Sequence, residues 1–142
     1  IISRLPMKSV QIFSFAVIAL MIATSAFGNE HHNMACENIT FSSDIDNCVS
    51  QKYQQSELRL KSEYLLFIAR ADKSYLNDIE LKHQYRKLAS GTHESWLVYR
   101  DLNCQLESFE VDAESVAHET IRKSCLEKMN NERIIMLQTT LQ

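Results

Sequence analysis

The sequence predicts an all-α protein: a compact antiparallel domain of about four to five helices, held by two disulfides. Two observations support this expectation. After residue 28 the chain contains a single glycine, Gly91, and no proline, so the two strongest helix breakers are nearly absent. Apolar residues also recur at three- and four-residue steps, and no alternating strand pattern stands beside them. Short links between helices favour antiparallel neighbours.

The first 28 residues are expected to be a signal peptide preceded by a few upstream residues. A lysine stands before an uncharged apolar run over 10–27, and small residues close the run at Gly28. Met7 fits the true start, and cleavage after Gly28 would leave residues 29–142 as the mature helical domain. A membrane anchor is the alternative, since about 18 apolar residues are long enough to consider. The lack of a following basic cluster favours the signal peptide.

All four cysteines lie in the expected mature part, at Cys36, Cys48, Cys104 and Cys125. An even number in an exported chain predicts two disulfides formed in an oxidising compartment, here the periplasm. Four cysteines allow three pairings, and we favour Cys36–Cys48 with Cys104–Cys125 because both pairs are close in sequence. A zinc site is disfavoured because closely spaced ligand pairs such as C-x₂-C do not occur. We expect no metal and no cofactor.

The charge of the mature chain disfavours two classes of partner. Arg4 and Lys8 leave with the signal peptide, so Lys and Arg fall from 15 to 13 against 18 acidic residues, and the net charge becomes −5. An acidic protein is poorly suited to nucleic acid or to an anionic membrane. The balance favours a basic protein partner, and no membrane association is expected after the signal is removed.

The first helix is expected to begin near Ser43 or Asp44, which are suitable N-cap residues. Polar residues at Asp72 and 77–78 indicate a bend or a break, and a second helix is expected over 76–89. Residues with helical spacing define the inner side of the first helix: Ile45, Cys48, Val49, Tyr53, Ser56, Leu60, Tyr64, Phe67 and Ala71.

The segment Ser90-Gly91-Thr92 is expected to end the second helix in a tight turn, with Thr92 as the N-cap of a third helix that runs to about residue 107. The segment 109–111 forms a short link. Asp112 can then cap a last helix over 113–141. The residues expected along one side of that helix are Val116, Thr120, Ile121, Cys125, Met129 and Met136.

The last helix also carries apolar residues on more than one side, which predicts a homodimer. These residues are Met129, Ile134, Ile135, Met136, Leu137 and Leu141.

The third helix holds the only tryptophan of the chain, within the stretch 93–104. Trp96, Tyr99, Arg100 and Cys104 recur at three- and four-residue steps, which places them on one side of the helix. Trp96 is therefore expected in the core. Cys104 is expected to meet Cys125 and to staple the third helix to the last.

The charged pair in this stretch is interpreted as structural. Arg100 and Asp101 are expected to pair with Glu132 or Arg133, or to cap backbone carbonyls. An enzyme is not expected, because a cysteine nucleophile needs a free thiolate and all four cysteines are expected to be oxidised. A G-x-S-x-G motif and a phosphate-binding loop are also missing from the sequence.

The same stretch resembles the W-x-x-Y-R-D-x-x-C signature of the LprI-type lysozyme inhibitor family, a group of small exported helical domains. The matching residues are Trp96, Tyr99, Arg100, Asp101 and Cys104. Weaker matches flank it, at Cys48, Glu57, Leu58 and Tyr64, and at Cys125, Leu126, Arg133 and Leu137. The chain lacks the family's Gly-Gly-Ser turn between the last two cysteines, and it has Arg59 and His93 where the family has Asn and Gln.

The chain also resembles periplasmic immunity proteins that protect type VI secretion bacteria from their own VgrG-type spike effector. That effector carries a lysozyme-like, peptidoglycan-degrading extension. Both resemblances imply that the protein inhibits a muramidase, and we expect it to do so by occluding the glycan cleft of that enzyme. The alternative is a general periplasmic helical protein, structural or interacting with another partner.

An inhibitor can fill such a cleft with an exposed, rigid projection. Two turns are candidates. The first covers 72–78 and contains Tyr75, Asn77 and Asp78, with Glu80 just after it; the second is the expected tight turn with Thr92 and His93. Tyr75 is the preferred anchor, because an aromatic residue in a polar turn suits an interface. The alternative is that Tyr75 folds back onto the core.

Overall fold

The protein folds into three α-helices in the part of the chain that the computed structural model describes, residues 36, 39 and 41–141. These are α1 (Ser42–Ser74), α2 (Ile79–Glu107) and α3 (Val116–Thr139). The all-α class and the two disulfides are confirmed. The expected number of four to five helices is wrong for these residues. The predicted signal peptide lies outside them.

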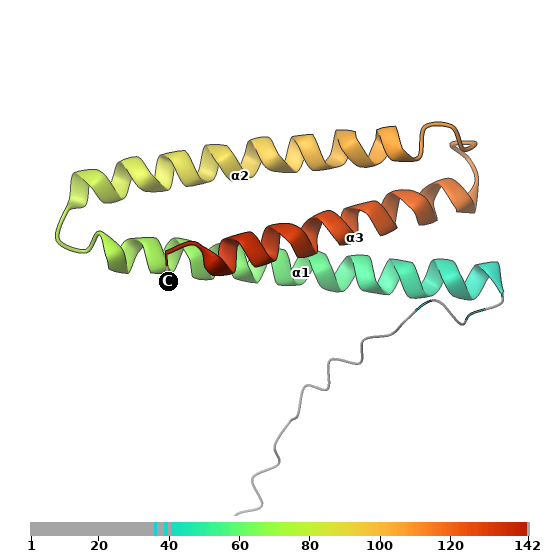
Figure 1. Cartoon of the computed structure of the whole chain (residues 1–142), viewed down its shortest axis with the longest axis horizontal. Coiled ribbons are helices and arrows are strands. Elements are labelled where there is room, and N and C mark those ends of the chain that lie inside the picture. The colour runs from blue at the N-terminus through green and yellow to red at the C-terminus, as the bar shows by residue number, and fades with distance from the viewer. Residues whose placement is uncertain (1–35, 37–38, 40, 142) are drawn as a thin grey trace, which may run out of the picture. The chain divides into compact units, whose positions relative to one another are not determined.

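The three helices run up, down and up, with α2 antiparallel to both of its neighbours (Figure 1). The most extensive contact joins α1 to α3, which run parallel, whereas α2 contacts α3 more than it contacts α1. One side of α2 therefore faces the bundle and the other side faces away from it. Among the described residues, no helix is long and apolar enough to cross a membrane.

The expected tight turn at residues 90–92 is absent, because α2 continues through it. Gly91 does not adopt a positive φ. The Thr92 hydroxyl donates to the carbonyl of Leu88 at 2.7 Å, one turn back, and the Ser90 hydroxyl donates to the Glu94 carboxylate at 2.8 Å. One glycine inside a helix costs about 1 kcal/mol. This cost is too small to break a helix of 29 residues that is fixed at both ends.

The helix ends lie close to the predicted positions but use other caps. Phe41, not Ser43 or Asp44, precedes α1, and it makes no side-chain cap. Asp78 caps α2, since its carboxylate accepts the backbone N–H of Leu81 at 2.9 Å. Ser115 caps α3 through the N–H of His118 at 3.1 Å.

Asp112, the predicted cap of the last helix, instead accepts the N–H of Glu114 at 3.1 Å. It stabilises a turn of the link between α2 and α3 rather than the start of the helix, because α3 begins at Val116, three residues after the predicted start at residue 113.

The core has two parts. One cluster packs Leu60 and Phe67 of α1 against Ile134 and Leu137 of α3. The other surrounds the Cys104–Cys125 disulfide and includes Leu126. The expected inner side of α1 is largely confirmed, with these members buried: Cys48, Ser56, Leu60, Phe67 and Ala71.

The expected inner side of the last helix is partly wrong. Val116 and Met136 are exposed, whereas Leu126, Ile134 and Leu137 are buried. The buried face of α3 is rotated because it also takes in Asn130, whose amide has partners inside the bundle. Two residues of the proposed second apolar side, Ile134 and Leu137, therefore belong to the core and are not free for a dimer.

Both expected disulfides are present. Cys36 bonds to Cys48, with 6.0 Å between their Cα atoms. Cys104 bonds to Cys125, with 5.5 Å between their Cα atoms. The second disulfide staples α2 to α3 beside their link, as the antiparallel arrangement predicts.

Candidate functional site

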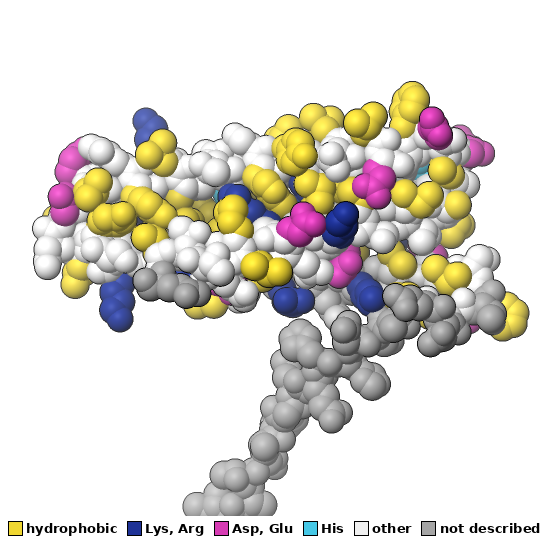
Figure 2. Space-filling view, in the orientation of Figure 1, with side chains coloured by type: hydrophobic (Ala, Val, Ile, Leu, Met, Phe, Trp, Pro, Cys, Tyr) yellow, Lys and Arg dark blue, Asp and Glu magenta, His cyan; other side chains and the backbone are white. Residues whose placement is uncertain are grey.

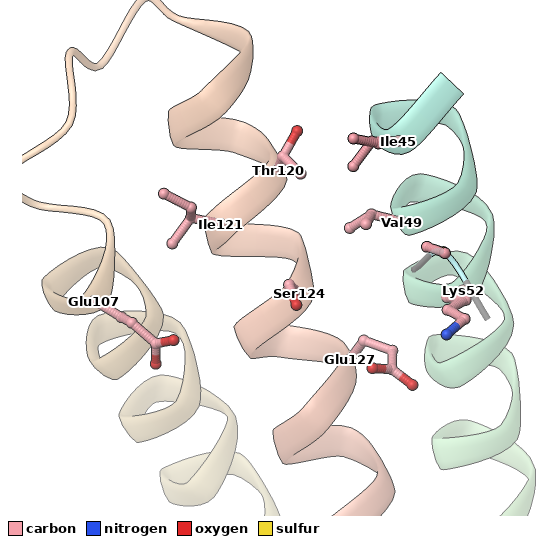
Figure 3. Close-up of a pocket in the computed structure, with 9 residues that line it drawn as sticks. Ile45, Val49, Lys52, Glu107, Thr120, Ile121, Ser124 and Glu127 are labelled. Carbon is pink, nitrogen blue, oxygen red and sulfur yellow. The ribbon is translucent and has the colours of Figure 1, made fainter. Parts of the chain in front are cut away.

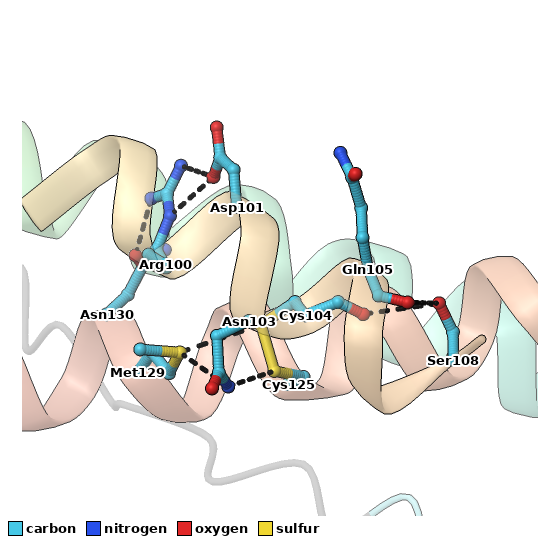
Figure 4. The surroundings of a disulfide bond; sticks show 9 residues. All are labelled: Arg100, Asp101, Asn103, Cys104, Gln105, Ser108, Cys125, Met129 and Asn130. Atoms are coloured by element: carbon cyan, nitrogen blue, oxygen red, sulfur yellow. Dashed lines mark hydrogen bonds and ion pairs between the residues drawn. A yellow bond between two sulfur atoms is a disulfide. The ribbon is translucent and has the colours of Figure 1, made fainter.

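Arg100 is the centre of a buried polar cluster that joins the three helices. The side chain rises from α2 and the residue is only 5% exposed. Its Nη1 donates to Glu57 Oε1 of α1 at 2.6 Å and to Asn130 Oδ1 of α3 at 2.7 Å. Its Nε donates to Asp101 Oδ1 at 2.9 Å (Figure 4). The buried guanidinium thus donates to two carboxylates and one amide oxygen. A buried charge needs such partners to offset the loss of its hydration.

Asn130 completes this cluster from α3. Its Nδ2 donates to Glu57 Oε1 at 2.7 Å and to the hydroxyl of Ser56 at 2.9 Å. The prediction that Arg100 pairs with Glu132 or Arg133 is wrong, because Glu132 faces solvent and Glu57 takes the place of the acidic partner. Asn130 was missed in the sequence, although a polar residue between buried Leu126 and Leu137 on one helical side was a usable signal.

Trp96 is half-buried, and two guanidinium groups lie close to its ring. The Cζ of Arg100 is 5.5 Å from the ring centroid and that of Arg133 is 5.3 Å from it. The ring also packs against the larger core cluster. The expectation of a core tryptophan is thus confirmed in part. Tyr99 is different, since it is 59% exposed and points away from the bundle.

His93 does not stand on a projecting turn. It lies inside α2, half-buried, with its ring stacked on that of Tyr64 at 4.0 Å between centroids and 6.2 Å from that of Trp96. Burial lowers the pKa of His93, and the nearby charges of Arg133 and Arg100 lower it further. Thr92 is exposed on the helix side that faces away from the bundle.

The turn between α1 and α2 is the candidate projection that remains. Its backbone is fixed by hydrogen bonds from Tyr75 N to Ala71 O and from Asp78 N to Tyr75 O. Tyr75 is half-buried, and its ring lies 5.2 Å from that of Tyr85, so it is partly folded back. Burial, with Tyr75 as a further cause, raises the pKa of Tyr85.

The polar residues of this turn are exposed. Asn77 and Asp78 face solvent, and so does Glu80, whose carboxylate accepts the side-chain amide of Gln84 at 2.9 Å. Thr92 lies about 20 Å further along α2, since a helix rises about 1.5 Å per residue. The structure therefore does not bring the two predicted projections together in one site.

A hollow of about 450 Å³ opens between α1 and α3. Ile45 and Val49 point from α1 toward α3 (Figure 3). The hollow is also lined by Lys52, Glu107 and Glu127. Within the described residues, no group of three His, Cys, Asp or Glu side chains could hold a metal ion. The four cysteines are in disulfides, so they offer no thiolate nucleophile.

The fold defines a small, all-helical domain with two disulfides. The buried cluster around Arg100 joins its three helices. The family model described as "Lysozyme inhibitor LprI" matches residues 36–137. The chain belongs to this family. Membership implies a lysozyme inhibitor in general, and the family together with the two disulfides indicates an exported protein.

Comparison with solved structures supports the fold of the chain. The chain is similar to the crystal structure of a DUF1311 family protein from Pseudomonas putida, with a TM-score of 0.61 and 21% sequence identity. The similarity covers 74% of this chain and 95% of that one. None of the curated proteins matches.

The buried cluster around Arg100 contains several residues of the family signature. The signature residues Trp96, Arg100 and Asp101 meet Glu57 and Arg133 in one place, although these were separate matches in the sequence. The signature thus fixes the packing of three helices. Tyr99 is the exception among these signature residues, because its side chain is exposed.

Proposed function

We propose that this protein is a periplasmic immunity protein that binds and inhibits a lysozyme-like type VI secretion effector of the VgrG type. The match of the LprI family over residues 36–137 carries the proposal. The net charge of −5 expected for residues 29–142 supports a basic, peptidoglycan-degrading partner. Export follows from the signal peptide over residues 1–28, which is part of the proposal.

Inhibition occurs by occlusion of the glycan cleft. A muramidase cleft is long and contains one or two catalytic carboxylates, so a rigid projection can block it without chemistry. The turn between α1 and α2 supplies the projection: Tyr75 is the anchor, and Asn77, Asp78 and Glu80 are the polar contacts. The hydrogen bonds of this turn keep the ordering cost of binding low.

Thr92 and His93 are not placed in this contact. Their assignment rested on a tight turn, and they lie within the continuous helix α2. A homodimer remains part of the proposal, but the side of the last helix that first suggested it is partly core.

The proposal is tested by titrating the lysozyme-like domain of the effector with the mature protein and following peptidoglycan hydrolysis. Stoichiometric protein should abolish hydrolysis. Tyr75→Ala and Asn77→Ala should raise the Kd at least tenfold while circular dichroism stays helical. Glu110→Ala, in the exposed link at the other end of the bundle, is the matched control and should bind like wild type.

Two outcomes would count against the proposal at different levels. If folded Tyr75→Ala and Asn77→Ala bind as tightly as wild type, this turn is not the contact. If an excess of wild-type protein leaves hydrolysis untouched, inhibition of this effector is wrong, and a general periplasmic interaction protein becomes the better description.

A further inference from the structure

The side of α2 that faces away from the bundle carries an unpartnered apolar stripe. Figure 2 shows hydrophobic side chains on the outer edge of α2, gathered mainly over its C-terminal half. Leu88 is 71% exposed and Phe109, just beyond the helix, is 79% exposed. The other members are more than half exposed as well: Val98, Tyr99, Leu102 and Leu106. Monomeric proteins seldom expose a contiguous apolar patch of this kind.

The stripe is interrupted by a shallow notch at small residues. A surface hollow of about 770 Å³ is lined by Leu88, Gly91, Thr92 and Ser95, among others. A Cβ placed on Gly91 would meet nothing within 4 Å. Neither the bundle nor a turn therefore requires a glycine here, although glycine costs the helix about 1 kcal/mol relative to alanine. Close approach of another backbone would explain the residue.

The stripe is self-complementary about Ser95. Leu88 and Leu102 lie seven residues before and after it, and Gly91 and Tyr99 lie four residues before and after it. At 3.6 residues per turn, all four stay on the side that Ser95 occupies. When two copies of α2 pack antiparallel, the Tyr99 ring of one copy meets the Gly91 notch of the other, and each Leu88 meets a Leu102.

The charges along α2 favour the same alignment. With the two-fold axis at Ser95, residues 82–88 of one copy face residues 102–108 of the other. The first stretch contains three basic side chains and no acid, and the second contains Glu107 and no base. A parallel pair would instead place the two basic stretches beside each other.

We propose that the outer side of α2 is the interface of a homodimer, in which two copies of this helix pack antiparallel across a two-fold axis at Ser95. The contact is isologous, as a two-fold interface must be. The inference rests on the homodimer in the proposed function and is independent of muramidase inhibition. It replaces the last helix, whose Ile134 and Leu137 are buried, as the dimer surface.

The first test is the mass of the mature protein by light scattering at tens of micromolar. Wild type should have about twice the monomer mass. Gly91→Leu fills the notch while improving helix propensity, so it should keep the helical circular dichroism and yet give the monomer mass, as should Leu102→Asp. Leu58→Asp, at a leucine of α1 that is 70% exposed, is the control and should remain dimeric. A monomeric wild type would overturn the proposal.

The second test fixes the register by cross-linking under oxidising conditions. Small residues allow two helix axes to approach to about 8 Å, which brings two cysteines at the two-fold axis within disulfide range. Ser95→Cys should therefore form a covalent dimer. Leu102→Cys should not link to itself, because the two positions would be about 21 Å apart, but it should link to Leu88→Cys in a mixture. Self-linking of Leu102→Cys with no mixed product would overturn the antiparallel register.

Neither test uses the effector, so failure here is separate from failure of the inhibitor proposal. If Leu102→Asp leaves a monomeric protein that no longer inhibits hydrolysis, and wild type is also monomeric, the stripe belongs to the effector contact and the dimer is wrong.

Discussion

Arg100 of α2 and Glu57 of α1 form an ion pair of 2.6 Å in the middle of the bundle, 43 residues apart in sequence. The guanidinium is almost fully buried, whereas about a third of the Glu57 side chain is exposed. A buried charge that loses its partner is costly, so this pair is a sensitive point of the fold.

Arg100→Ala is expected to lower the free energy of unfolding by about 3–5 kcal/mol, because it leaves the Asn130 amide and the Glu57 carboxylate without their shared donor. Urea denaturation measures the change. Arg86→Ala is the control: its pair with Asp72 at 3.2 Å is exposed, and it should cost less than about 1 kcal/mol. Equal losses for both variants would contradict the central role of Arg100.

The Cys104–Cys125 disulfide closes a loop with a sequence separation of 21. Replacing both cysteines with alanine should cost about 3 kcal/mol by the chain-entropy relation. Reduction of the wild-type protein should lower Tm, while far-ultraviolet circular dichroism below Tm stays helical. A Tm that does not respond to reductant would show that the disulfide adds nothing to stability.

Trp96→Ala should lower the free energy of unfolding by about 3 kcal/mol, less than for a fully buried tryptophan, because the ring is only half-buried. Part of this loss comes from the contacts of the ring with two guanidinium groups. Trp96→Phe should cost less because it keeps an aromatic face. Inhibition by the folded fraction of Trp96→Ala should equal that of wild type. A variant as stable as wild type that fails to inhibit would place Trp96 in the contact surface instead.

Stability should fall on acidification partly through His93. Burial lowers the pKa of its ring in the folded state, so the unfolded chain binds more protons between the lowered pKa and about 6.5. Stability is therefore present above about pH 6.5 and is lost as pH falls toward the folded-state pKa. His93→Phe keeps the stack on Tyr64 and should show a smaller loss between pH 7 and 5 in urea denaturation. Parallel pH profiles for the two proteins would refute this assignment.

Features set by neighbouring residues could be predicted from the sequence. The near-absence of glycine and proline after residue 28 predicted helices, and the short spacing of the cysteines predicted both disulfides. The break between the first two helices at 75–78 followed from polar residues that hydrogen-bond the backbone locally. The W-x-x-Y-R-D-x-x-C motif led to the family that the chain belongs to.

Features set by distant residues were decided only by the tertiary structure. The helix α2 is held on both sides of Gly91, because Tyr85 and Ala89 pack against the core and Cys104 is bonded to Cys125. A local glycine signal does not include these contacts. The partner of Arg100 is Glu57 and not Glu132, because α1 presents its carboxylate to the bundle while Glu132 faces solvent. The inner side of α3 is set by the buried amide of Asn130 rather than by apolar spacing alone. In each case more than one side of the helix has a sequence that could be buried, and packing against the neighbouring helices decides which side is.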